Sequence, residues 1–247
     1  MTFKDLFSAQ SGDYARFRPT YPDALFTWLA SVAPGHACAV DVATGTGQAA
    51  LLLAPHFTRV VALDASAAQL TAAPARANVE YGVAPAEATG LPPASADLLT
   101  AAQAFHWFDQ ARFFTEAARV LRPGGVLAVW CYGLSHIEPA VDAIVAHLYG
   151  DVLGSYWEPE RRLVEDGYRG VVFPFQPLVV PPFEVTADWD LAGLLGYLRT
   201  WSALKAFVRA RGIDPLAALA PDLARVWGDP AAPRAVRWPL SVHARRH

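Results

Sequence analysis

The chain has 247 residues and a formal net charge of −3, and 53% of its residues are hydrophobic, among them thirteen Phe and eight Trp. This length and apolar content fit one α/β domain with an elaboration and exclude an intrinsically disordered protein. Lys and Arg are scattered rather than clustered, which excludes the basic stripe that binding to a nucleic-acid backbone requires.

The apolar segments and the two cysteines indicate which signal, membrane and metal features to expect. Residues 1–5 lack the apolar stretch of a secretory signal, and no run approaches the ~18 apolar residues of a membrane span. Cys38 and Cys131 lie in apolar runs without zinc-like spacing, which favours core positions and predicts no metal site. We therefore expect a cytoplasmic monomer or homodimer whose partner is a small molecule, with no nucleic acid and no membrane involved.

Strands and helices are expected to alternate along the first half of the chain. Residues 1–35 form an amino-terminal arm with a helix at 23–32. The expected core spans 36–132, with strands beginning at Cys38 and at 60–64, 78–83, 97–102 and 126–132, and with helices at 47–55, after Ser66 and at 109–121.

The second half breaks this rhythm. Residues 133–247 are expected to form the substrate side, with a helical insertion at 135–170, a proline-interrupted strand within 171–185, helices near 190–199, 203–211 and 216–227, and a last strand at 236–242. Strand–helix alternation with right-handed crossovers gives a doubly wound sheet. The sequence thus predicts a single α/β domain with a Rossmann-like, mostly parallel, seven-stranded sheet, a helical arm at its start and a helical insertion after the fifth strand.

A glycine turn follows the first predicted strand. The run Val40-Asp41-Val42-Ala43-Thr44-Gly45-Thr46-Gly47 passes from β-branched to small residues before an Ala/Leu-rich helix. Glycine allows positive φ and close approach of the backbone, so the turn predicts a site for a nucleotide-like ligand. Two interpretations remain open at this point: Gly45-x-Gly47-x-x-Ala50 fits the fingerprint of NAD and FAD enzymes, and Asp41 at the head of the loop fits a ligand without phosphates.

Electrostatics distinguishes these ligands. A carboxylate at the strand end repels a pyrophosphate in a partly desolvated site, and it favours a ligand with an ammonium and a sulfonium, such as S-adenosylmethionine. Asp64, at the end of the second strand, is suited to accept the ribose hydroxyls of either nucleotide. The alternative for Asp64 is a structural acid at the start of the next helix.

Further motifs flank the fourth and fifth strands. Gln103-Ala104-Phe105-His106-Trp107-Phe108-Asp109 follows the fourth strand, and Glu116-x-x-Arg119-Val120-Leu121-Arg122-Pro123-Gly124-Gly125 precedes the fifth. With the Asp41 loop and Asp64, this order resembles the class I S-adenosylmethionine-dependent methyltransferases, especially the small-molecule branch with trans-aconitate methyltransferase-like and ubiquinone-pathway-like enzymes. The resemblance covers about residues 14–132, and the segments 14–22 and 197–202 are similar to that group as well.

The resemblance implies a cofactor site. Asp41 and the glycines would line the methionine and ribose side, Ala86 and Glu87 would flank the adenine, and Gln103 would lie under the sulfonium. Arg18 is a candidate partner for the methionine carboxylate or for an acidic substrate. The expected cofactor-binding residues are Tyr14, Arg18, Asp41, Ala43, Gly45, Gly47, Asp64, Ala65, Ala86, Glu87, Gln103 and Ala104.

Two positions depart from the pattern of that group. Ala43 stands where a glycine is usual, and alanine fits there if its φ is negative, which predicts a slightly altered loop. Pro85 stands where many relatives carry an acid that contacts the adenine amino group. Either Glu87 makes that contact or backbone and apolar packing hold the adenine.

The acceptor side is expected around His106. This residue follows the fourth strand, and its ordinary pKa suits a general base, although it can also serve as a polar wall that orients the acceptor. Aromatic rings near a sulfonium can attract its charge, although core packing is the alternative. The expected acceptor-binding residues are Trp107, Trp130, Tyr132 and Trp201, with His106 as the catalytic candidate.

The sequence therefore predicts a methyltransferase that uses S-adenosylmethionine and acts on a small molecule, by O-methylation of a carboxylate or hydroxyl. Two alternatives remain: an NAD(P)-dependent oxidoreductase and a non-catalytic S-adenosylmethionine-binding regulatory module. The chain has only two lysines, Lys4 and Lys205, which nearly excludes the Tyr-x-x-x-Lys design of one oxidoreductase class.

Overall fold

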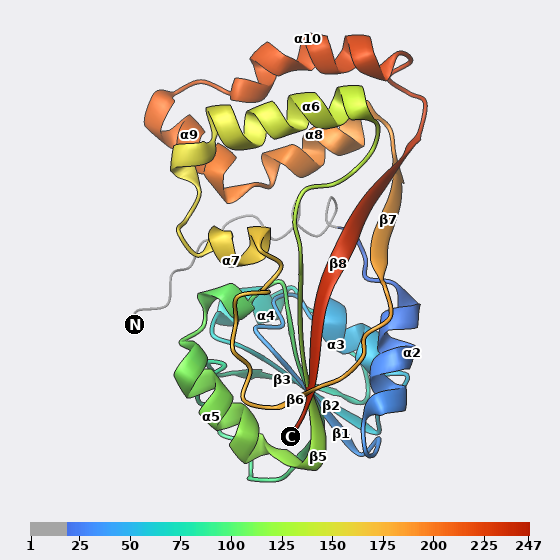
Figure 1. The fold of residues 1–247 in the computed structure, drawn as a ribbon, viewed down its shortest axis with the longest axis vertical. Coiled ribbons are helices and arrows are strands. Elements are labelled where there is room, and N and C mark those ends of the chain that lie inside the picture. Colours follow the sequence, from blue (N-terminus) through green and yellow to red (C-terminus); the bar gives the residue numbers. More distant parts are fainter. Residues whose placement is uncertain (1–18) are drawn as a thin grey trace.

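The computed structural model describes residues 19–247. Figure 1 shows two layers, a sheet flanked by helices below and a group of helices above. The chain enters the upper layer after β5 (Leu121–Tyr132) and returns along the long strand β8 (Arg234–Arg246). The helical insertion predicted at 135–170 supplies one part of this upper layer, and the helices predicted after residue 190 supply the rest.

The lower layer is built on a mostly parallel sheet. Its other strands are β1 (Cys38–Val42), β2 (Arg59–Asp64), β3 (Val79–Val83), β4 (Ala96–Ala102) and the short β6 (Gln176–Pro177). The order β3-β2-β1-β4-β5-β8-β6 confirms the predicted Rossmann-like topology, and β8 is antiparallel to β5 and β6. The sheet has eight strands rather than the predicted seven, because a further strand pairs with β8 outside this order. The strand order reverses between β1 and β4, so the connections that follow these two strands run to opposite sides of the sheet. A crevice is therefore expected at the carboxyl ends of β1 and β4.

Both faces of this sheet are covered, which explains the unbroken burial of β1 and of nearly all of β2. The helices α2 (Asp23–Val32) and α3 (Gln48–Leu53) pack on one face, and α5 (Gln110–Val120) packs on the other. Side-chain caps set some of the helix starts: Ser66 accepts a hydrogen bond at the start of α4 (Ala67–Thr71), and Asp109 does so at the start of α5.

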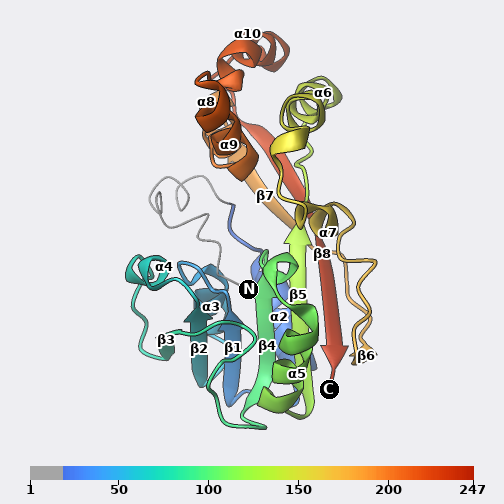
Figure 2. The ribbon, with the colours of Figure 1, turned by 90° about the vertical axis from the view of Figure 1, so that its left-hand side faces the viewer.

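The upper layer lies beyond the carboxyl ends of the parallel strands, toward which β5 points in Figure 2. Its main helices are α6 (Pro139–His147), α8 (Leu191–Arg199), α9 (Ser202–Arg211) and α10 (Pro215–Trp227). The strand β7 (Glu184–Trp189) pairs with the upper half of β8, and the short helix α7 (Arg161–Glu165) lies between the two layers. Among the helices of residues 19–247, none has the length and apolar character needed to cross a membrane.

Three predicted elements differ from the structure. β5 begins at Leu121, before the Arg122–Gly125 turn, with a register shift in its pairing to β4. β8 extends well beyond 236–242 at both ends, because it has a different partner strand on each half. Residues 171–175 form no strand, and the interrupted strand of that region reduces to β6 and β7.

Candidate active site

The loop between β1 and α3 has three residues in the left-handed region. Ala43, Gly45 and Gly47 have φ of 51°, 58° and 83°. A Cβ atom on Gly47 would lie 2.5 Å from the hydroxyl oxygen of Tyr81 and 2.9 Å from its ring, so no larger residue fits without a shift. The loop therefore exposes backbone at the carboxyl end of β1, where open α/β sheets bind nucleotides.

Ala43 corrects the expectation of an altered loop. Its φ is positive, so the loop keeps the left-handed backbone that glycine would favour, and alanine carries the steric cost. That cost is about 1–2 kcal/mol for a single residue. The departure at this position thus changes the stability of the loop rather than its path.

Replacing Ala43 by glycine is expected to raise the free energy of unfolding by about 1 kcal/mol, because the strain is relieved at the expense of some entropy of the unfolded chain. Denaturant unfolding measures this change. The matched control is Ala54→Gly, at a residue with a φ of −57°, where glycine is expected to destabilise by a similar amount. A loss of stability in Ala43→Gly would contradict the left-handed assignment.

Two carboxylates flank this loop. Asp41, only 1% exposed, accepts hydrogen bonds from the hydroxyls of Thr44 (2.5 Å) and Thr100 (2.7 Å). Burial raises the pKa of Asp41 to about 6 despite these bonds, and the charge of Asp64 adds to the shift. Asp64 itself accepts a hydrogen bond from the backbone N–H of Gly45 (2.8 Å). Two neighbouring acids favour a cationic ligand and disfavour a pyrophosphate.

The remaining residues expected at the cofactor lie around the same edge of the sheet. Ala65 follows Asp64 and is half-buried, and Ala86 and Ala104 are buried. The Glu87 carboxylate accepts the backbone N–H of Asp109 (2.9 Å), so it holds the start of α5 and has one oxygen left for a ligand. Tyr14 and Arg18 lie outside the described residues.

Gln103 connects the ends of β4 and β5. Its side-chain amide donates to the Tyr132 carbonyl (3.1 Å) and accepts the Tyr132 N–H (2.8 Å). Its φ is 54°, a value that is uncommon for a residue other than glycine and that clusters at functional sites. Gln103 is therefore fixed at the mouth of the crevice between the loop and the upper layer.

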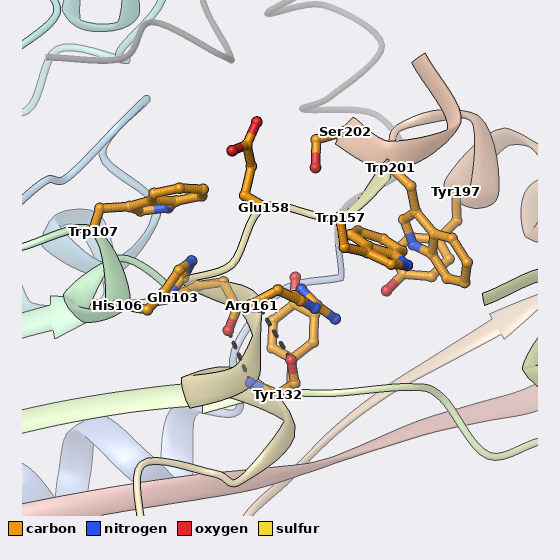
Figure 3. Close-up of a pocket in the computed structure, with 10 residues that line it drawn as sticks. All are labelled: Gln103, His106, Trp107, Tyr132, Trp157, Glu158, Arg161, Tyr197, Trp201 and Ser202. Atoms are coloured by element: carbon orange, nitrogen blue, oxygen red, sulfur yellow. Dashed lines mark hydrogen bonds between the residues drawn. The ribbon is translucent and has the colours of Figure 1, made fainter. Parts of the chain in front are cut away.

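A cavity opens directly beyond Gln103. It lies between the end of β4 and the helices α7, α8 and α9. In Figure 3, Trp107 lies on one side, and Trp157, Trp201 and Tyr197 lie on the other. The lining residues are Gln103, His106, Trp107, Tyr132, Trp157, Glu158, Arg161, Tyr197, Trp201 and Ser202.

His106 belongs to this wall as a neutral side chain. Its Nδ1 lies 3.0 Å from the hydroxyl of Tyr168, which is fully buried. Burial lowers the pKa of His106 to about 3, and the positive charge of Arg161 adds to this effect. A histidine with so low a pKa is a weak base, so the geometry favours the role of a polar wall over that of a general base.

Five of the residues predicted for the cofactor and acceptor sites lie together in the cavity wall, and a sixth, Trp130, lies elsewhere. Gln103, His106, Trp107, Tyr132 and Trp201 all line the cavity. Trp130 does not: it is completely buried, and its ring packs edge-on against Tyr21 and Phe26. Trp130 and Tyr132 share one face of β5, but Trp130 lies one step deeper, where α2 covers it. Core packing is therefore the role of Trp130 in this structure.

Five wall residues are absent from the sequence prediction: Trp157, Glu158, Arg161, Tyr197 and Ser202. The similarity of segment 197–202 to the methyltransferase group contained a signal for the last two. Nothing in the spacing of residues 157–161 distinguishes them from surface positions, because only the packing of α7 between the two layers brings them to β4.

Comparison with known proteins matches this geometry. The family model described as "Methyltransferase domain" matches residues 40–129. A Dictyostelium discoideum protein named as a methyltransferase is 36% identical over 87% of this chain and 83% of its own length. A Saccharomyces cerevisiae protein named as an S-adenosylmethionine-dependent methyltransferase is 29% identical over 65% of this chain and 60% of its own length.

A solved structure extends the match to the whole fold. A protein from Anaeromyxobacter dehalogenans, described as a type II methyltransferase, is 51% identical, with a TM-score of 0.88 over 93% of this chain and 97% of that chain. The glycine loop, its two carboxylates and the sheet order agree with this match. The chain belongs to the methyltransferase domain family and is a class I S-adenosylmethionine-dependent methyltransferase.

Proposed function

We propose that this methyltransferase methylates an oxygen atom, of a carboxylate or a hydroxyl, on a small-molecule acceptor. The observation that carries the proposal is the cavity beyond Gln103, which combines aromatic walls with a few polar side chains, as small-molecule sites do. Gln103 follows β4, the strand that pairs with β1, so an acceptor in this cavity would lie on the side of the donor. Such proximity contributes much of the acceleration in transfer reactions.

S-adenosylmethionine, when bound, supplies a methyl group on a positively charged sulfur that is a good leaving group. The residues suited to hold it are the left-handed loop at 43–47, Asp41 and Asp64. The fit rests on the left-handed backbone of the loop at the end of β1 and on the two buried carboxylates, which match a cationic ligand.

The weak basicity of His106 and the positive charge of Arg161 support an oxygen acceptor over an amine. An amine is largely protonated at neutral pH and must lose a proton before it reacts, and His106 is too weak a base to take it. The guanidinium of Arg161, in the same wall, also disfavours an ammonium group. A carboxylate needs no base, because it is already ionised.

The test is methyl transfer from S-adenosylmethionine to a panel of carboxylic acids, phenols and amines, with the methylated products identified by mass spectrometry. We expect products on oxygen only. Calorimetry with S-adenosylmethionine and NADH accompanies the panel, and we expect binding of the first alone. Transfer confined to amines would refute the proposal.

A further inference from the structure

Arg161 is the guanidinium group in the wall of the cavity, and it is held in place before any ligand binds. Its Nε donates to the hydroxyl of Tyr149 (3.0 Å), and its guanidinium carbon lies 5.0 Å from the ring centre of Trp157 and 5.6 Å from that of Tyr149. These contacts use one N–H and the flat faces of the guanidinium. The two terminal nitrogens, which suit a carboxylate fork, remain for another partner.

Among the described residues, no carboxylate acts as the counter-ion of Arg161. Within residues 19–247, six other arginines have a carboxylate oxygen within 4.0 Å, and Arg161 has none. Glu165 is joined to Arg161 only through Tyr149, whose hydroxyl it accepts (2.5 Å). The carboxylate of Glu158 also reaches the wall, but Figure 3 shows it pointing away from the guanidinium.

The field of this charge reaches the whole site. Arg161 adds to the lowering of the pKa of His106, and it acts in the same direction on the pKa of Cys131 and Tyr149, where burial is the larger and opposite effect. Arg161 is a half-buried cation that faces a cavity, and no carboxylate oxygen of the described residues lies within 4.0 Å of it. This position favours an anionic ligand that completes the pair.

The rest of the wall indicates what the anion is attached to. Five of the lining residues are aromatic: Trp107, Tyr132, Trp157, Tyr197 and Trp201. Aromatic faces bury flat, apolar groups and stack with them. A ligand that fits both features has one anionic end and a flat body.

We propose that Arg161 binds the carboxylate of the methyl acceptor, and that the acceptor is a small carboxylic acid with a flat, apolar body. This inference rests on the proposed function, in which the cavity holds the acceptor. The reaction balances without a proton: a carboxylate oxygen gains the methyl group, the carbon–sulfur bond breaks with its electron pair on sulfur, and an ester and a neutral thioether result. The ester lacks the charge that Arg161 recognises, so it binds more weakly than the acid.

The experiment compares acids with their neutral amides on the full chain. Benzoate and cinnamate, with benzamide and cinnamamide, serve as probes in calorimetric binding with S-adenosylhomocysteine present and in initial-rate assays with S-adenosylmethionine. We expect the acids to bind and the amides to fail. Arg161→Gln is expected to weaken binding of the acids about tenfold or more, and Arg161→Lys to restore part of it, because lysine keeps the charge but not the fork.

The matched control is Arg162→Gln, which removes an exposed arginine from the same helix and is expected to change nothing. S-adenosylmethionine affinity is expected to stay unchanged in all three variants. Equal binding of acids and amides, or acid binding that Arg161→Gln leaves intact, would overturn the inference. Its failure differs from that of the proposed function: methylation of phenols without acid binding refutes the role of Arg161 alone, and Arg161-dependent acid binding without transfer to any oxygen refutes the proposed function alone.

Discussion

Replacing Asp64 by alanine is expected to weaken the binding of S-adenosylmethionine more than tenfold. The carboxylate, at the end of β2, accepts the backbone N–H groups of Gly45 and Ser66, each at 2.8 Å. It thereby holds the glycine loop at the carboxyl end of β2, where a ribose is expected to bind. Hydrogen bonds to a charged group contribute about 1.5–3 kcal/mol each, and about 1.4 kcal/mol is a tenfold change in affinity.

Calorimetric titration measures this affinity. Two further variants serve as an intermediate case and as a control. Asp64→Asn keeps the shape and one acceptor oxygen, so we expect an intermediate loss. Glu80→Gln, on the neighbouring strand β3, removes an exposed acid that pairs with Arg59, and the affinity is expected to remain unchanged. Unchanged affinity in Asp64→Ala would mean that the ribose binds elsewhere.

The affinity for S-adenosylmethionine is expected to fall as the pH drops below about 6, by nearly tenfold per unit. Burial raises the pKa of Asp41 to about 6 in the free protein, and a cationic ligand favours the ionised carboxylate. Below this pH the carboxyl group must lose a proton when the ligand binds, whereas above it no proton is lost and the affinity is flat. Calorimetry at about pH 5, 6 and 7.5, in buffers of different ionisation enthalpy, counts the released proton.

The variant Asp41→Asn separates this effect from other titrations, because it is expected to remove the pH step and to weaken binding at neutral pH. A pH step in Asp41→Asn equal to that of the parent would contradict the role of Asp41.

The raised pKa of Asp41 has the opposite effect on the free energy of unfolding, which falls as the pH rises. Between the ordinary pKa of 3.8 and the native pKa of about 6, the folded protein holds the Asp41 proton more tightly than the unfolded chain, so stability falls as the pH rises through this window. At pH 7 the loss is roughly 3 kcal/mol, at about 1.36 kcal/mol per pKa unit. Asp41→Asn is therefore expected to be more stable than the parent at neutral pH, which denaturant unfolding measures.

Much of the sheet could be predicted from the sequence because its strands are marked locally. A short run of Val, Ala and Leu between turn residues, as at 60–63, is typical of a strand buried on both faces. The predicted strand bounds are wrong where the presence of a partner strand decides whether a segment becomes a strand. Residues 171–175 have strand-forming composition but gain no partner, whereas residues 243–246 extend β8 because β5 lies beside them.

The residues of the candidate site also fall into those that the sequence predicts and those that it does not. Asp41, Asp64 and Gln103 are predictable because the carboxyl ends of parallel strands meet at one edge of the sheet. Arg161 is not, since α7 reaches that edge only through the packing of the insertion. Trp130 shows a third limit: alternation along a strand assigns a side chain to a face, but it does not tell how deep under the covering helix the side chain lies.

The strand β8 has a mechanical consequence. Residues 240–246 are hydrogen-bonded to β5 in the lower sheet, and residues 234–239 are hydrogen-bonded to β7 beneath the upper helices. Helices that are joined to a sheet only by flexible loops can move as a unit relative to it. Here the upper helices are also joined to the sheet by a continuous paired strand, so such a movement requires that strand to bend. β8 therefore connects the two layers through one continuous paired strand, which limits how far the upper helices can move relative to the sheet.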